Sequence, residues 1–78
     1  MRYEILKYQN IRNLRESRDL SPKTVAKHLN ITQNTYSRYE TNDRNIPIDV
    51  LDKLADFYNT SVDYLIGRTN DARPYPQI

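Results

Sequence analysis

The sequence has no cysteine, no tryptophan, one histidine and one glycine among its 78 residues. Without cysteine no disulfide can form, and a structural zinc site, which takes four Cys or His ligands, cannot be assembled. A single glycine disfavours a fold built from tight hairpins, because those turns need residues that accept positive φ. The chain is therefore predicted to be mostly helical and to hold no metal or other cofactor.

Long apolar runs are also missing. No stretch approaches the roughly 18 consecutive apolar residues that a membrane helix needs, and the amino terminus lacks the hydrophobic segment of a signal peptide. We therefore expect a cytoplasmic protein with no membrane partner. A chain of this size has room for one small hydrophobic core, so we expect a single folded domain.

Charge is distributed unevenly along the chain. The net charge is only +2, yet residues 1–31 hold seven basic and three acidic side chains, whereas residues 48–67 hold one basic and four acidic ones. Such a division predicts one positive face and one face that repels polyanions. Charges scattered over a solvated surface are the alternative interpretation.

Apolar periodicity and capping residues predict five short helices. The segments are 8–18, 22–29, 33–41, 47–58 and 62–66. Residues 1–7 are expected to form an amino-terminal arm, either extended or as an extension of the first helix. Residues 68–78 contain two prolines after a polar run and are expected to form a flexible carboxyl-terminal tail. The folded domain is thus expected over residues 8–67.

Serine and threonine residues mark where several of these helices begin. Ser21, Thr32 and Ser61 each precede a helical segment, and a side-chain oxygen at that position accepts a free amide of the first turn. Pro22 follows Ser21 at the first helical position, where a residue without an amide is well tolerated. Asn30 is expected in the left-handed conformation that ends many helices.

The second and third segments have the spacing of a helix-turn-helix. Ala26 lies where the two helices would cross, and a small side chain there lets the backbones approach. Asn30 makes the turn, Ile31 fills the junction, and Tyr36 anchors the later helix on the earlier one. An ordinary helical hairpin shares these features, so the pattern alone leaves both interpretations open.

The surrounding sequence resembles the phage-repressor (Cro and XRE-type) helix-turn-helix family over about residues 8–68. The resemblance is carried by the motifs IRNLRE, TQNTYSRYE and SVDYLIG. It implies a compact, all-α, five-helix domain of the lambda-repressor type that binds double-stranded DNA, usually as a homodimer on a two-fold related operator. A protein of this kind is expected to regulate transcription, as a repressor that occludes a promoter.

The resemblance also assigns roles to residues of the recognition helix, here the segment 33–41. Gln33, Asn34 and Arg38 match the base-reading positions of the family, with Ser37 and Thr32 beside them as secondary base or backbone contacts. The side chains suit this role, since Gln or Asn can pair with adenine, and Arg with guanine O6 and N7, in the major groove. An ordinary polar helix face is the alternative.

Other basic residues are candidates for contacts with the DNA backbone. Arg44 follows the recognition helix in a loop that meets phosphates or the minor groove in relatives. Lys23, Lys27 and Arg12 would add sequence-independent attraction to DNA, or are simply solvated cations.

Arg15 and Glu40 match an ion pair that bridges the first and third helices in this family. A partly buried pair orients the recognition helix more than it stabilises the fold, because desolvation offsets much of the Coulomb attraction. Solvation of both side chains at the surface is the alternative.

Three positions depart from the family pattern. Pro22 replaces a glutamine whose side chain contacts a phosphate in relatives, so that contact is lost. Asn42 stands where glycine is frequent, which the tolerance of asparagine for left-handed conformation explains. Asp43 places a negative charge in a loop that is often basic, so we expect weakened affinity for phosphate. His28 is expected on the exposed side of its helix, with no chemical role.

Two other functions are weighed against DNA binding. The chain could be an antitoxin or another protein-interaction module on the same fold, with a protein partner bound through its acidic region and tail. An enzyme is disfavoured, because acid–base or nucleophilic catalysis needs converging groups that this sequence does not supply. Tyr58, Tyr64 and Ile66 are candidates for a dimer surface, or else ordinary core residues.

Overall fold

The computed structural model describes residues 9–75, and the regular structure in that range is entirely helical. It consists of α2 (Gln9–Ser17), α3 (Pro22–Leu29), α4 (Gln33–Glu40), α5 (Ile48–Tyr58) and α6 (Val62–Leu65). The prediction of an all-α domain with five short helices is confirmed. The expected amino-terminal arm, Tyr8 at the start of the first predicted helix and the end of the tail lie outside the described residues.

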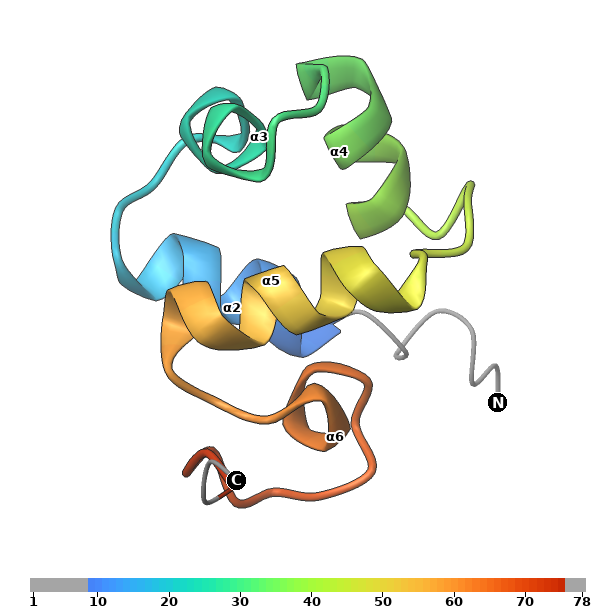
Figure 1. Cartoon of the computed structure of the whole chain (residues 1–78). Coiled ribbons are helices and arrows are strands. Elements are labelled where there is room, and N and C mark those ends of the chain that lie inside the picture. The colour runs from blue at the N-terminus through green and yellow to red at the C-terminus, as the bar shows by residue number, and fades with distance from the viewer. Residues whose placement is uncertain (1–8, 76–78) are drawn as a thin grey trace.

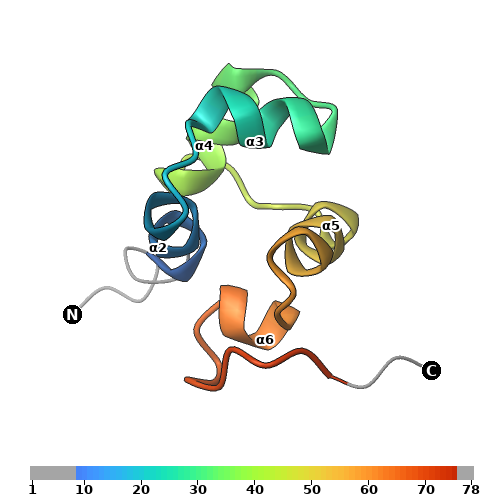
Figure 2. The same cartoon turned by 90° about the vertical axis from the view of Figure 1, so that its left-hand side faces the viewer.

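The helices form three levels along the long direction of Figure 1. The pair α3 and α4 lies at one end of the molecule, α2 and α5 cross its middle, and α6 closes the other end. The view turned by 90° shows α2 and α5 on opposite sides of the middle level (Figure 2). None of the helices within residues 9–75 has the length and apolar character needed to cross a membrane.

One hydrophobic core joins all five helices. Each helix contributes at least one buried apolar or aromatic side chain, and burial of such surface is the main favourable contribution to folding. The core consists of Ile11, Val25, Ala26, Leu29, Tyr36, Tyr39, Ile46, Val50, Leu51, Leu54, Ala55, Tyr58 and Leu65. Because α3 and α4 share this core with the other helices, their position relative to the rest of the domain is fixed.

Side-chain caps begin three of the helices, as predicted. Ser21, Thr32 and Ser61 each accept a hydrogen bond from the backbone amide three residues later, at 3.0–3.1 Å. Asn30 ends α3 with φ 61°, which confirms its expected left-handed conformation, and Asn59 ends α5 in the same way with φ 55°. Local polar chemistry therefore sets most of the helix boundaries.

Some helix ends fall one residue earlier than predicted. The first predicted helix stops before Arg18, because Arg18 and Asp19 form a turn in which Asp19 has φ 55°. Thr41 caps α4 instead of extending it, and Ile66 caps α6. Gly67 follows with φ 83°, as expected for a residue that ends a helix.

The first part of the predicted tail folds back onto α6 and the end of α5. The hydroxyl of Thr60 donates a hydrogen bond to the carbonyl of Ala72 at 2.6 Å, and the hydroxyl of Tyr75 donates to the carboxylate of Asp63 at 2.6 Å. The segment runs past α6 in Figure 2. The domain boundary at residue 67 stays a prediction.

Tyr58 belongs to the core, so the suggestion that it forms part of a dimer surface is wrong. Only 2% of this residue is exposed, because the last turn of α5 directs its ring into the domain. Tyr64 and Ile66 are half-buried and remain candidates for a dimer contact.

Candidate nucleic-acid interface

α4 has a buried side and an exposed side. Tyr36 and Tyr39 are 0% and 6% exposed and anchor the helix on the core. Gln33, Asn34 and Arg38 are exposed. The structure thus presents to solvent the three side chains to which the resemblance assigns base contacts, on a helix whose opposite side is held by two aromatic rings.

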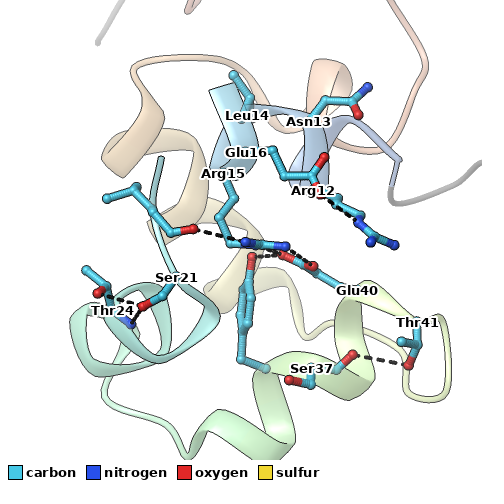
Figure 3. Close-up of polar contacts among 12 residues, drawn as sticks. Arg12, Asn13, Leu14, Arg15, Glu16, Ser21, Thr24, Ser37, Glu40 and Thr41 are labelled. Carbon is cyan, nitrogen blue, oxygen red and sulfur yellow. Dashed lines mark hydrogen bonds and ion pairs between the residues drawn. The ribbon is translucent and has the colours of Figure 1, made fainter. Parts of the chain in front are cut away.

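The side chains of Thr32 and Ser37 are less available for contacts with DNA bases than the exposed polar side chains of α4. The hydroxyl of Thr32 accepts the amide of Thr35 at 3.1 Å and donates to the hydroxyl of Thr35 at 2.9 Å. Ser37 is half-buried, and its carbonyl accepts a hydrogen bond from the hydroxyl of Thr41 at 3.1 Å (Figure 3). Thr32 therefore serves first as the helix cap, and Ser37 lies at the edge of the exposed side.

A hollow of about 680 Å³ lies between α3 and α4. Lys23 and Lys27 stand one helical turn apart on its α3 side, and both are exposed. The remaining lining residues are Ala26, Asn30, Ile31, Thr32 and Gln33. The hollow therefore places two cations beside the first turn of α4, where the backbone amides carry partial positive charge.

The loop after α4 is tied to that helix through its backbone. The carbonyl of Arg38 accepts hydrogen bonds from the amides of Asp43 at 2.9 Å and Arg44 at 3.3 Å. Asn42 has φ 66°, so its expected left-handed conformation is confirmed. The side chains of Asp43 and Arg44 are exposed, and the loop thus carries one charge of each sign next to the end of α4.

Arg12 lies on α2, outside the helix-turn-helix itself. Its Nε atom lies 3.2 Å from Oε2 of Glu16, and the two side chains are 54% and 53% exposed. An ion pair this open to water contributes about 0–1 kcal/mol, so it can exchange for a phosphate contact. Arg12 is therefore a weaker candidate for a phosphate contact than Lys23 or Lys27, because Glu16 partly cancels its charge.

Arg15 and Glu40 are brought together between α2 and the end of α4 (Figure 3). Nε of Arg15 donates to Oε2 of Glu40 at 2.6 Å, and Nη2 donates to Oε1 at 3.1 Å. A third guanidinium nitrogen, Nη1, donates to the carbonyl of Leu20 at 2.9 Å. One arginine of α2 therefore holds both the end of α4 and the turn that leads into α3.

Burial and the Glu40 carboxylate shift the acid–base equilibria of this cluster. The hydrogen bond from Arg15 to Glu40 raises the pKa of the guanidinium. Burial, followed by the hydrogen bond to Glu40, raises the pKa of Tyr36. Burial also raises the pKa of Tyr58 to about 12. At neutral pH the cluster therefore contains a charged arginine and two protonated tyrosines.

Two contacts at the helix-turn-helix are not predicted from the sequence. The hydroxyl of Tyr36 donates a hydrogen bond to Glu40, one turn later on the same helix. Their spacing of four residues is the signal that could have revealed it. His28 is exposed as expected, yet its ring stacks on that of Phe57 with 4.2 Å between the centroids. This second contact joins α3 to α5 and has no local signal.

The exposed side of α5 has the opposite charge. Asp49, Asp52 and Asp56 are all exposed there, and one basic residue, Lys53, stands among them. Within residues 9–75, no three His, Asp or Glu side chains are placed so that they could hold a metal ion. Lysines thus lie on α3 and beside the first turn of α4, whereas aspartates dominate the exposed side of α5.

Comparison with known proteins identifies a family and several relatives of this chain. A helix-turn-helix family matches residues 11–65. The HTH-type transcriptional regulator YobD of Bacillus subtilis is 36% identical over 66 residues, which cover 85% of this chain and 59% of that protein. The HTH-type transcriptional regulator ImmR of the same organism is 37% identical over 60 residues, which cover 77% of this chain and 47% of that protein.

A phage protein is also similar to this chain. The cryptic phage CTXphi transcriptional repressor RstR of Vibrio cholerae is 36% identical over 57 residues, which cover 73% of this chain and 51% of that protein. The chain spans about half the length of the curated relatives that it matches. No solved structure gives a significant match.

Proposed function

The chain belongs to the phage-repressor (XRE-type) helix-turn-helix family of DNA-binding transcription regulators, which are not enzymes, and from this premise we propose that it is a sequence-specific repressor. It binds a pseudo-palindromic operator as a homodimer and prevents transcription by occluding the promoter. It acts in the cytoplasm, where its DNA target lies.

The exposed side of α4 is the observation that carries this proposal. Gln33, Asn34 and Arg38 are exposed together on one helix, while Tyr36 and Tyr39 hold the other side in the core. A major groove admits one α-helix, and the functional groups of these three side chains match the edges of adenine and guanine. The arrangement supports base reading by α4.

Sequence-independent attraction comes from the cations around α4. Lys23 and Lys27 border the hollow beside its first turn, and Arg44 lies in the loop after its last turn. Phosphate contacts of this kind set the register of the protein on the duplex and give binding its salt dependence. The negative charge of Asp43 repels phosphates, so the proposed affinity for unrelated DNA is moderate rather than strong.

The operator geometry follows from two-fold symmetry. In a homodimer on DNA the two copies of α4 enter successive major grooves on one face of the duplex, about 34–36 Å apart. Tyr64 and Ile66, which are half-buried in the monomer, are the proposed dimer contacts.

Selection of binding sites from random duplexes with the purified protein tests the proposal. We expect an enriched imperfect palindrome whose affinity falls steeply as the salt concentration rises. The double variant Gln33→Ala, Arg38→Ala is the control and is expected to enrich no sequence while it stays folded. If the wild-type protein also enriches none, the repressor proposal fails, and a protein-interaction module such as an antitoxin becomes the better account.

A further inference from the structure

Tyr36 lies on the buried side of α4, beneath the helix surface that faces solvent. The residue is 0% exposed, and its hydroxyl donates a hydrogen bond to Oε2 of Glu40. The same oxygen accepts a hydrogen bond from Nε of Arg15 at 2.6 Å. The Glu40 carboxylate is thus held from two directions, by a phenol of its own helix and by a guanidinium of α2.

Arg15 extends this arrangement beyond the ion pair. Its Nη1 atom donates to the carbonyl of Leu20 at 2.9 Å, in the turn that precedes α3. A guanidinium is planar and rigid, so fixing its Nε and Nη2 atoms on Glu40 also fixes the direction of Nη1. The position of the carboxylate therefore bears on both helices of the helix-turn-helix.

Glu40 needs such a restraint because its side chain contains several rotatable bonds. Two parallel hydrogen bonds from an arginine are directional, and they require the carboxylate plane to match the guanidinium plane. Without the Tyr36 hydroxyl, that plane is restrained only by Arg15 itself. A site that reads base edges tolerates errors of about 0.5 Å or 10–20° in its supporting geometry.

We propose that Tyr36 is a positioning residue for base reading. Its hydroxyl orients Glu40, and Glu40 orients Arg15. These linked contacts fix the angle at which the exposed side of α4 meets the major groove of DNA. The inference rests on the proposed function and concerns discrimination between operator and unrelated DNA. Affinity for unrelated DNA depends on Lys23 and Lys27, which lie outside this cluster.

Tyr58 supplies a matched control for a change at Tyr36. It is also a core tyrosine, only 2% exposed. Its hydroxyl, however, is buried and has no hydrogen-bond partner among the described residues. A Tyr→Phe change at either position removes one buried oxygen and leaves the ring in place. The Tyr58 hydroxyl lies near the same charged groups but makes no hydrogen bond to Glu40, so the two variants differ in that hydrogen bond.

The test compares Tyr36→Phe with Tyr58→Phe on DNA. For each folded variant, the dissociation constants for a selected operator and for an unrelated duplex are measured at one salt concentration. Tyr36→Phe is expected to weaken operator binding about tenfold and to leave binding to unrelated DNA unchanged. Tyr58→Phe is expected to change neither. A retained operator preference in Tyr36→Phe, or an equal loss in Tyr58→Phe, overturns the inference.

A second measurement needs no DNA and separates this inference from the proposed function. In the free protein, the NMR resonance of the Arg15 Nε–H group reports its hydrogen bond to Glu40. We expect that resonance to shift or broaden in Tyr36→Phe, and to shift much less in Tyr58→Phe, whose hydroxyl lies near the cluster but is not bonded to Glu40. An unchanged resonance in Tyr36→Phe contradicts the positioning role even if the wild type binds an operator. A wild type that selects no operator contradicts the proposed function instead.

If Tyr36→Phe does not fold, Glu40→Asp takes its place. The shorter side chain withdraws the carboxylate from both Tyr36 and Arg15 while it keeps the charge. The expected result is again a loss of operator preference with unchanged binding to unrelated DNA. A Glu40→Asp variant that discriminates as well as the wild type overturns the inference.

Discussion

Arg15 and Glu40 are 25 positions apart in the sequence, yet Nε of Arg15 lies 2.6 Å from Oε2 of Glu40. Their side chains are only 11% and 8% exposed. Removing two charges from water offsets much of their attraction, so such a pair contributes less to stability than its short distance suggests. Its structural effect is to join α2 to the end of α4.

Breaking this pair from one side leaves a buried charge without a partner. We predict that Glu40→Ala lowers the free energy of unfolding by about 3–5 kcal/mol, because Arg15 then remains buried and unpaired. Urea denaturation measures the change. The control is Glu16→Ala, which removes the partner of Arg12 in an exposed pair and is expected to cost no more than about 1 kcal/mol. Equal losses in the two variants would argue against a special role for the buried pair.

Arg38 and Lys27 are expected to contribute differently to DNA binding. Arg38→Ala should reduce discrimination at one operator position by about 1–3 kcal/mol, because an arginine that reads guanine makes two hydrogen bonds to its edge. Lys27→Ala should weaken binding to all sequences alike and reduce the slope of log affinity against log salt by about one. Binding assays on operator variants at several salt concentrations measure both effects. A uniform loss from both substitutions contradicts this assignment.

Stability is predicted to fall at alkaline pH because of the buried tyrosines. Burial raises the pKa of Tyr58 to about 12, whereas a tyrosine in the unfolded chain titrates near about 10. Between these values the unfolded chain has released its proton and the folded protein has not, so unfolding becomes easier as pH rises. The contribution of Tyr58 to stability is complete below the pKa that its hydroxyl has in the unfolded chain. It is lost as the pH rises through the higher pKa of the folded protein. The pKa of Tyr36 is raised by burial and acts in the same direction.

Urea denaturation between pH 8 and about pH 11.5 measures this dependence. Over the alkaline part of the range, the free energy of unfolding of Tyr58→Phe is expected to fall more slowly with pH than that of the wild type. Identical slopes for the two proteins would show that Tyr58 titrates alike in the folded and unfolded states.

The spacing of operator half-sites gives a geometric prediction. Inserting about five base pairs between the half-sites rotates one of them to the opposite face of the duplex, so a dimer that binds both on one face can no longer do so. We expect the affinity for that DNA to fall to the value for a single half-site, as measured by gel-shift titration. A single half-site is the control. Full affinity after the insertion is incompatible with a dimer of the proposed geometry.

The parts of the fold that depend on residues close together in the sequence could be predicted from the sequence. Ser21 and Thr32 cap helices through amides three residues away, and Asn30 adopts a left-handed conformation because its own backbone allows it. Each of these features is complete within a few residues of chain. The helix-turn-helix could therefore be placed almost to the residue.

Contacts between distant side chains could not be predicted in the same way. The stack of His28 on Phe57 and the bond from Thr60 to Ala72 depend on how helices and tail are arranged in space. The sequence leaves Tyr58 open as a core residue or a dimer contact, since the apolar stripe of a helix does not reveal which partner covers it. The DNA contacts of the exposed residues on α4 stay predictions, because their partner is not part of the chain.

NMR mapping of the DNA contact shows which side of the domain meets the duplex. The ¹⁵N-labelled protein is titrated with a selected duplex, and the amide shift changes are followed residue by residue. We expect the largest changes at Gln33, Asn34 and Arg38, with smaller ones at Lys23 and Lys27. Changes concentrated on the exposed aspartates of α5, with α4 unaffected, would contradict it.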